Sequence, residues 1–143
     1  MIWSLESAEH FPNKTKFIQE AHRLLKSNGK LVIETWCTKN PHLSRITQFM
    51  LSIINYGFHT AAWTSRQEYY QLLKKHNFRS MRDQVWTKDV LPFWRHVIMT
   101  AINPYNFFRL ASYGPSSLLS SIMLYMGYLT STIEFVIMTA TKI

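Results

Sequence analysis

Hydrophobic and polar positions predict a strand, a helix and a second strand at the start of the chain. Residues 2–5 form a short apolar segment that is typical of the end of a buried strand. Apolar residues then recur at helical spacing, with Asn13 placed to cap the helix and residues 27–29 (Ser-Asn-Gly) placed to end it. The apolar run inside residues 30–36 predicts a strand that is buried on both faces. The three segments form a βαβ unit, whose two strands must be parallel.

The first helix is predicted to be amphipathic. Its apolar face comprises Phe17, Ile18, Ala21, Leu24 and Leu25. The positions off that face carry Lys14, Lys16, Glu20, Arg23 and Lys26. We therefore expect the helix to pack on the sheet through the first set and to expose the second.

The remaining pattern predicts five more helices and two more strands. The helices cover residues 43–58, from Thr64 or Ser65 to about Asn77, 90–102, 105–110 and 117–129, and the strands cover residues 78–86 and 133–141. In the helix over 43–58 the apolar stripe comprises Leu43, Ile46, Phe49, Met50, Ile53 and Ile54. In the helix over 90–102 one side comprises Phe93, Trp94, Val97, Ile98 and Ala101. Arg79 and Arg82 indicate that the strand over 78–86 is partly exposed.

Composition and charge narrow the class of protein. A chain of 143 residues with 47% hydrophobic and 17% charged residues is long and apolar enough for one domain with a core, which excludes intrinsic disorder. The net charge of +8 implies attraction to anionic surfaces but decides no fold. Cys37 is the single cysteine, which excludes a disulfide framework and a multi-cysteine zinc site and suits a reducing compartment.

Targeting and membrane signals point to an intracellular protein, cytoplasmic or peripheral to a membrane. Glu6, Glu9 and His10 follow Met1 almost at once, so the pattern predicts no secretory signal peptide. The longest apolar tract, residues 118–140, is interrupted by serines, threonines and a glutamate. That composition favours a helix followed by a strand over a membrane-spanning helix.

Glu9 and His10 are the strongest candidates for chemistry, because they directly follow the first predicted strand. In open α/β sheets, ligands bind at the carboxyl ends of the strands. There His10 could serve as a general base, with Glu9 orienting its imidazole or holding a substrate hydroxyl. The alternative is that the pair caps the next helix and faces water. Spacing alone favours the alternative, since adjacent residues rarely share a face.

Other chemical signals are weaker. The sequence holds no glycine-rich phosphate loop, and its six histidines lack metal-ligand spacing, so we expect no metal site. Cys37 could act as a nucleophile, but a buried, inert thiol is the favoured interpretation. The basic stretch Lys74-Lys75-His76, with Arg79 and Arg82 beyond it, could contact phosphate, although such a run is usually a solvated helix end. The many aromatic residues fit an apolar substrate pocket better than nucleobase stacking, and we expect no nucleic-acid partner.

Four segments carry a resemblance to a known family. They are residues 3–12 (WSLESAEHFP), 33–37 (IETWC), 62–65 (AWTS) and 91–98 (LPFWRHVI), in that order. With them the chain resembles the C-terminal half of class I S-adenosylmethionine-dependent methyltransferases, and most of all the tocopherol O-methyltransferase (γ-tocopherol methyltransferase) family. The first segment is shared by many small-molecule methyltransferases, and the Pro-Phe-Trp segment is more specific.

The resemblance implies an α/β fold that forms part of a Rossmann-like sheet. Its strands would be the fourth to the seventh of that sheet, with the last one antiparallel. Residues 1–38 would hold the fourth strand, a helix and the fifth strand, and residues 65–86 a helix and the sixth strand. Residues 39–64 and 87–131 would form a helical cover over the substrate, and residues 132–143 would form the seventh strand.

The resemblance also implies roles for individual residues. His10 would be the base on the acceptor side and Glu9 its partner. Trp3 and Ser4 would lie against the methionine portion of S-adenosylmethionine. The walls of an apolar pocket for a lipophilic phenol or quinol would comprise Trp36, Trp63, Phe93 and Trp94.

This sequence matches only the later part of the family's fold. It does not contain counterparts of the family's first three strands, its glycine-rich cofactor loop or the acidic residue that holds the cofactor ribose. We therefore expect this chain alone to bind S-adenosylmethionine very weakly or not at all, and a complementary N-terminal half to restore turnover. The acceptor atom stays open, because related enzymes also methylate nitrogen or carbon. The alternative function is a non-catalytic module that docks on a membrane surface or a partner chain.

Overall fold

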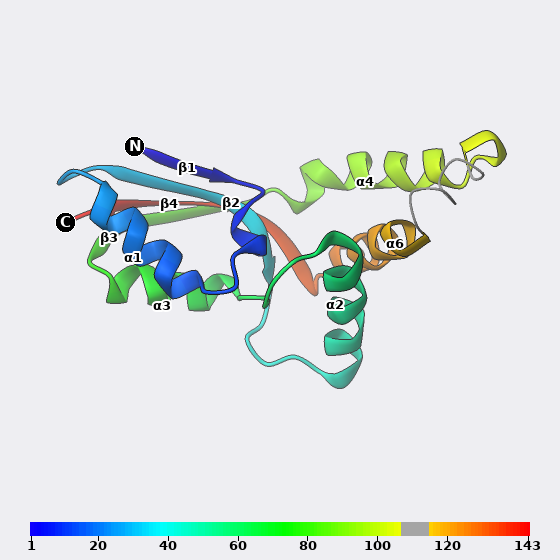
Figure 1. Ribbon diagram of the computed structural model, residues 1–143, viewed down its shortest axis with the longest axis horizontal. Coiled ribbons are helices and arrows are strands. Elements are labelled where there is room, and N and C mark those ends of the chain that lie inside the picture. The colour runs from blue at the N-terminus through cyan, green and yellow to red at the C-terminus, as the bar shows by residue number, and fades with distance from the viewer. Residues whose placement is uncertain (107–114) are drawn as a thin grey trace.

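The computed structural model describes residues 1–106 and 115–143 as an α/β fold (Figure 1). Its elements are β1 (Ile2–Leu5), the 3-10 turn η1 (Ala8–His10), α1 (Lys14–Leu24), β2 (Lys30–Thr38), α2 (Arg45–Phe58), α3 (Arg66–Lys75), β3 (Phe78–Val85), α4 (Thr87–Ala101), α6 (Pro115–Leu129) and β4 (Ile133–Lys142). The predicted helix over 105–110 lies largely outside the described residues.

The four strands form one sheet in the order β1-β2-β4-β3. β1 and β2 are parallel, with Trp3 opposite Val32, which confirms the predicted βαβ unit. β4 is antiparallel to both β2 and β3 and lies between them. The prediction of a last, antiparallel strand is therefore confirmed.

Two apolar cores lie on opposite faces of the sheet, because successive side chains of a strand alternate between faces. From β2, Leu31, Ile33 and Cys37 join the core beneath α1 and α3. Trp36 joins the second core, which α2, α4 and α6 build at the right-hand end of the sheet in Figure 1. The prediction that this strand is buried on both faces is confirmed.

The first strand departs from the sequence prediction, because it is not buried on both sides. Ser4 is buried, but Trp3 and Leu5 on the other face are 58% and 51% exposed. In the part of the chain that the structure describes, no helix lies over β1 on that face (Figure 1). β1 is also an edge strand, so it combines an open apolar face with an open hydrogen-bonding edge.

In α1 the predicted cap is confirmed and two of the predicted exposures are wrong. The side chain of Asn13 accepts a hydrogen bond of 2.9 Å from the backbone N–H of Lys16. Leu24, predicted on the buried face, is 60% exposed at the last residue of the helix. Lys14, predicted off that face, is buried, and its ammonium donates to the carbonyl of Phe11 at 2.7 Å. That hydrogen bond lets a charged side chain lie inside the first turn.

The predicted cap of α3 is confirmed, with Ser65 rather than Thr64 in the capping position. The backbone N–H of Glu68 donates to the Ser65 hydroxyl, and the Glu68 carboxylate accepts from the backbone N–H of Ser65 at 2.7 Å. This capping box fixes where α3 begins. Tyr69 and Leu73 are then buried in the core, and Leu72 packs against it.

The apolar stripe predicted for α2 is only partly correct. Ile46 and Phe49 are 83% and 69% exposed, whereas Leu51 and Ile54 are buried. The helix carries apolar residues on most of its surface, so periodicity alone does not decide which side packs. The close approach of α6 decides it at Gly57, where a Cβ atom would lie 2.1 Å from the Ser120 hydroxyl.

The apolar tract over 118–140 divides into α6 and β4, as predicted. Within the described ranges, no helix has the length and apolar character needed to cross a membrane. In α4, Ala101 is buried as predicted, but Phe93 is 61% exposed at the edge of the second core. The middle of α4 therefore presents an aromatic ring to solvent beside the packed Trp94.

Candidate functional site

Aromatic rings gather where β2 ends. We call Trp36, Phe58, Trp63 and Trp94 the aromatic cluster. The indole of Trp36 stacks on that of Trp63 at a centroid distance of 6.3 Å and an interplanar angle of 17°. It meets Trp94 edge-on at 6.0 Å and Phe58 at 5.6 Å. Phe93 extends the group outward, 5.4 Å from Trp94.

The structure thus brings together the four residues predicted to line an apolar pocket. Trp36 comes from β2, Trp63 from the loop after α2, and Phe93 and Trp94 from α4. Phe58, at the end of α2, belongs to the cluster and was missed by sequence reasoning, because the predicted stripe of that helix lay elsewhere. A phenylalanine at the last turn, one residue after a glycine, was the available signal.

Asn55 fixes the ring of Trp63. Its amide oxygen accepts from the Trp63 indole N–H at 2.7 Å and from the Thr60 hydroxyl at 2.6 Å. Both donors lie in the segment that follows α2, so one side chain holds that segment against the helix. The polar end of Trp63 is satisfied, and its apolar face is left to the cluster.

Glu9 is buried in η1, just after the carboxyl end of β1. Its carboxylate accepts a hydrogen bond of 2.7 Å from the Thr35 hydroxyl of β2. Its backbone carbonyl accepts from the N–H of Ala61 at 2.8 Å and from the Lys14 ammonium at 3.3 Å. η1 is thereby tied to β2, to α1 and to the segment that carries Trp63.

His10 is exposed, and its Nδ1 lies 3.2 Å from the carbonyl oxygen of His59. Because a carbonyl only accepts, Nδ1 carries the proton in this contact and Nε2 keeps the lone pair that a general base needs. The Glu9 carboxylate binds Thr35 instead of the imidazole. The expected pairing of Glu9 with His10 is thus replaced by two separate contacts, since adjacent residues of a 3-10 turn diverge.

The alternative for this pair is also only partly correct. Asn13, not Glu9 or His10, caps α1. His10 faces water as that alternative expects, whereas Glu9 is 6% exposed and faces the protein interior. The structure thus places a buried carboxylate and an exposed imidazole next to each other just after β1.

Trp3 and Ser4, predicted to contact the cofactor, lie on opposite faces of β1. The Ser4 hydroxyl shares a hydrogen bond of 2.8 Å with the Ser7 hydroxyl, and the Trp3 ring is exposed on the uncovered face.

Tyr128, near the end of α6, was missed by sequence reasoning. It is 3% exposed, and its hydroxyl has no hydrogen-bond partner among the described residues. Burial raises the pKa of Tyr128 and the carboxylates of Glu6 and Glu9 raise it further, while the nearby Trp94 side chain lowers it by a smaller amount. The indole N–H of Trp36 is likewise buried without a partner in the described part of the chain. A buried tyrosine usually finds a partner for its hydroxyl, so this group stands out.

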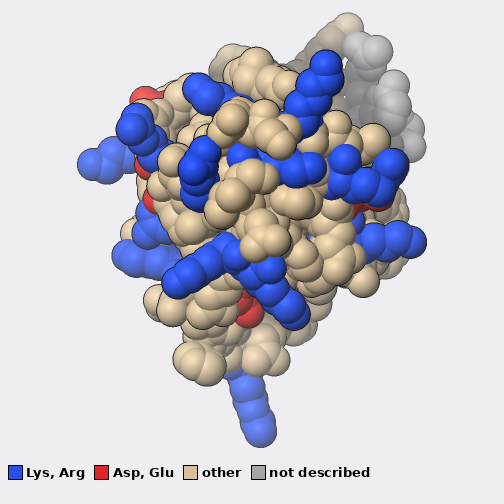
Figure 2. All heavy atoms as spheres, turned by 90° about the vertical axis from the view of Figure 1, so that its left-hand side faces the viewer, with Lys and Arg blue, Asp and Glu red and all other residues tan. Residues whose placement is uncertain are grey.

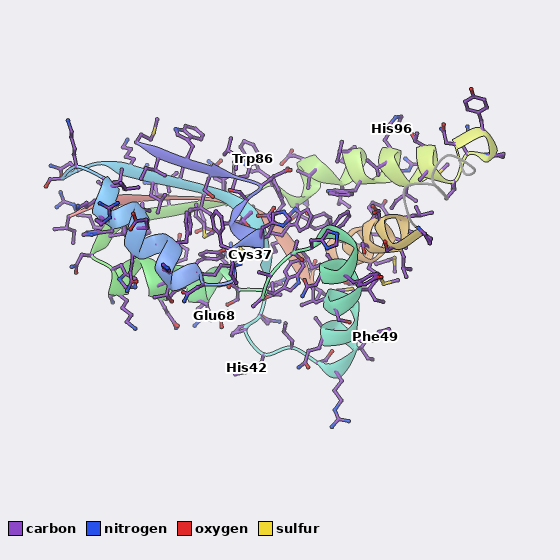
Figure 3. All side chains as sticks on the ribbon, viewed as in Figure 1. Cys37, His42, Phe49, Glu68, Trp86 and His96 are labelled. Atoms are coloured by element: carbon purple, nitrogen blue, oxygen red, sulfur yellow. The ribbon has the colours of Figure 1, made fainter. Side chains whose placement is uncertain are left out.

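The remaining sequence candidates lie elsewhere. Burial raises the pKa of Cys37, which is fully buried, and this supports the inert thiol over the nucleophile. Figure 3 shows His42 and His96 on separate outer segments, and the described residues contain no cluster of three metal-ligating side chains. Lys74, Lys75 and Arg79 are exposed where α3 ends and β3 begins, on the face where Figure 2 shows many lysines and arginines.

A sequence model of the methyltransferase domain family matches residues 1–82. The chloroplastic tocopherol O-methyltransferase of Arabidopsis thaliana is 33% identical, and the match covers 99% of this chain and 43% of the relative. The chloroplastic probable tocopherol O-methyltransferase of Oryza sativa subsp. japonica is 26% identical, with coverage of 99% and 41%. The chain therefore spans less than half the length of these two relatives.

Solved structures share the fold. The geranyl diphosphate C-methyltransferase from Streptomyces coelicolor A3(2) matches with a TM-score of 0.75 at 20% identity, over 99% of this chain and 45% of that one. The putative sarcosine dimethylglycine methyltransferase from Galdieria sulphuraria matches with a TM-score of 0.76 at 18% identity, over 99% and 52%. These matches cover nearly all of this chain and about half of each solved chain.

Proposed function

The chain belongs to the methyltransferase domain family, and from that premise we propose that it forms the acceptor-binding part of an S-adenosylmethionine-dependent methyltransferase. The acceptor we propose is a lipophilic phenol or quinol of the tocopherol type. The observation that carries the proposal is the aromatic cluster, because Phe58 and Trp63 flank the segment through which His59 and Ala61 bind the 3-10 turn that carries Glu9 and His10. The two tocopherol O-methyltransferases at 33% and 26% identity support the choice of acceptor.

The aromatic cluster suits the body of such an acceptor. A pocket for a prenylated ring needs broad apolar walls and only a few polar groups to fix orientation. Trp36, Trp63 and Trp94 supply the walls, with offset and edge-on contacts that a further ring can join. The exposed Phe93 stands at the outer end, where an isoprenoid chain would leave the pocket.

His10 supplies the base. When bound, S-adenosylmethionine supplies an electrophilic methyl group next to the acceptor. Nε2 of His10 takes the phenolic proton, because Nδ1 is committed to the carbonyl of His59. Loss of that proton raises electron density on the oxygen and on the ring carbons, so the step serves either acceptor atom. Glu9 is a positioning residue here, since its contacts with Thr35 and Ala61 hold η1 in place.

The cofactor would be held mainly by a complementary N-terminal part. Trp3 and Ser4 would line the side of the cofactor site that this chain contributes. The open face and open edge of β1, with Trp3 and Leu5 each more than half exposed, suit contact with further chain. The match to about half of each solved methyltransferase supports a partner of that kind.

The test is a hybrid enzyme. The chain is fused behind the segment of the Arabidopsis relative that precedes the matched region, and methyl transfer from labelled S-adenosylmethionine to a tocopherol is measured. We expect turnover by the hybrid, and no measurable calorimetric binding of S-adenosylmethionine by the chain alone. Micromolar binding of S-adenosylmethionine by the chain alone would contradict the proposal that an N-terminal part holds the cofactor. A folded hybrid that methylates no phenol or quinol would contradict the function.

The role of His10 is tested in the same hybrid. We expect His10→Ala to lower kcat by about 10²- to 10⁴-fold, the usual contribution of a general base. His42→Ala, in the loop before α2, is the matched control and should leave turnover unchanged (Figure 3). If His10→Ala keeps full activity at all pH values, the base is another group.

A second candidate function is docking on an anionic membrane surface without catalysis. The observation that favours it is the apolar outer side of α2, where Ile46, Phe49 and Tyr56 are 83%, 69% and 76% exposed. The net charge of +8 adds attraction to anionic lipid. Co-sedimentation with anionic vesicles should then fall as salt rises, and an Ile46→Ser, Phe49→Ser variant should lose it. If the fraction of protein that co-sediments changes neither with salt nor with these substitutions, this function is excluded.

A further inference from the structure

Two buried hydrogen-bond donors in the second core have no partner in the described part of the chain: the hydroxyl of Tyr128 and the indole N–H of Trp36. Tyr128 is 3% exposed and Trp36 is 8% exposed. A buried donor without an acceptor is costly, and such groups are rare in proteins unless they have a use. Both residues belong to the same apolar cluster, so the two donors lie in one region of the molecule.

We propose that the Tyr128 hydroxyl and the Trp36 N–H together bind the ring oxygen of the acceptor and so select an oxygen-bearing ring over an amine. This inference rests on the proposed function, which it deepens by naming what fixes the acceptor in the pocket. The aromatic cluster itself binds any flat apolar molecule. The two donors add the directional contact that the cluster lacks.

The chemistry of the two donors defines the ligand. An indole N–H only donates, and a tyrosine hydroxyl that stays protonated also donates. Burial raises the pKa of Tyr128, with Glu6 and Glu9 adding to the effect, so the hydroxyl keeps its proton at physiological pH. If both donors bind one ligand atom, that atom must carry lone pairs. A phenol, phenolate or quinone oxygen provides them, whereas a protonated amine does not.

The position of Tyr128 suits this role. It lies in the last turn of α6, just before β4, where Gly127 brings the helix against Ile133 and leaves no room for a Cβ atom. That close packing holds the tyrosine beside the end of β2 from which Trp36 projects. Donors held rigidly in an apolar site stabilise negative charge on an oxygen better than mobile ones do. Tyr128 and Trp36 would therefore also favour the phenolate that His10 generates.

Tyr69 provides a matched control. It is fully buried, and its hydroxyl also has no hydrogen-bond partner among the described residues. It lies in the core beneath α1 and α3, on the other face of the sheet from the aromatic cluster. Tyr69→Phe and Tyr128→Phe thus remove the same atom from equally buried rings, and only the second removes it from the proposed site.

The experiment compares binding of two probes by the full chain in neutral detergent. One probe is a tocopherol and the other is the same molecule without its ring hydroxyl, and affinities are measured by calorimetric titration. We expect the wild-type chain and Tyr69→Phe to prefer the hydroxylated probe by about tenfold, the worth of one good hydrogen bond. We expect Tyr128→Phe to bring that preference close to one. Trp36→Phe should also reduce the preference for the hydroxylated probe. If Tyr128→Phe does not fold, the preference measured for Trp36→Phe is the test of the proposal.

Three outcomes would overturn the inference. They are equal binding of the two probes by the wild-type chain, an unchanged preference in Tyr128→Phe, and an equal loss of preference in Tyr69→Phe. The hybrid enzyme is judged separately. A hybrid without turnover contradicts the proposed function, while a preference that disappears only with Tyr128 and Trp36 still supports oxygen recognition at this site.

Discussion

The hydrogen bond between Thr35 and Glu9 predicts a measurable loss of stability when it is removed. The Glu9 carboxylate is 6% exposed and receives a hydrogen bond of 2.7 Å from the Thr35 hydroxyl, which is itself buried. Thr35→Val keeps the volume and the branched Cβ of the side chain but deletes the donor. Because a hydrogen bond to a charged group contributes about 1.5–3 kcal/mol, we expect the free energy of unfolding to fall by about 2 kcal/mol. For a chain of this size, the melting temperature should fall by about 4–8 °C.

A double-mutant cycle isolates that interaction. Urea unfolding is measured for the wild-type chain, Thr35→Val, Glu9→Leu and the double variant, and we expect a coupling free energy of about 1.5–2 kcal/mol. Thr139→Val is the control, since this half-buried threonine of β4 has no side-chain hydrogen bond among the described residues, and it should change stability by less than about 0.5 kcal/mol. A coupling free energy below about 0.5 kcal/mol would refute the view that Thr35 anchors Glu9.

Three other predictions concern packing, reactivity and pH. Gly57→Ala should destabilise the chain by about 1–3 kcal/mol in urea unfolding, because its Cβ would collide with α6; a neutral effect would contradict the close contact. Cys37 should react with iodoacetamide only as fast as the protein unfolds, since it is fully buried and burial raises its pKa. Rapid labelling of the folded chain would instead support the interpretation of Cys37 as a reactive nucleophile. Burial, then the charges of Lys142 and His76, lower the pKa of His22, so the unfolded chain binds the extra proton first. Stability should therefore fall as pH drops below about 6.5, and His22→Gln should flatten that slope in melting experiments from pH 7.5 to 5.

The sheet and its first helix could be predicted because each has a local cause. Leu31, Val32 and Ile33 of β2 are consecutive apolar residues, so their side chains are buried on both faces of the sheet. The caps at Asn13 and Ser65 act within three residues of sequence. β1 was different. Its residues are as apolar as those of β2, yet Trp3 and Leu5 are exposed, because burial depends on what covers a strand and not on the strand alone.

The candidate site was predictable in its residue types but not in its contacts. Trp36, Trp63, Phe93 and Trp94 lie together in one group of rings, whereas Glu9 binds Thr35, a residue 26 positions away, rather than its neighbour His10. No local spacing reports such a contact. Ile46 and Phe49 were assigned to the wrong side of α2 for a related reason: a helix that is apolar on most of its surface acquires a buried face only when a second helix meets it at Gly57.

The place of β4 in the sheet has a consequence for how the chain folds. β4 comes after every other described element along the chain, yet it lies between β2 and β3, which do not pair with each other. During synthesis from the N-terminus, one edge of β2 therefore stays unpaired until β4 has left the ribosome. Until then β3 also has no neighbouring strand with which to pair. Such late, long-range pairing slows folding and leaves strand edges open to other chains. We infer that the intermediate most prone to aggregation is the nascent chain that ends in α6.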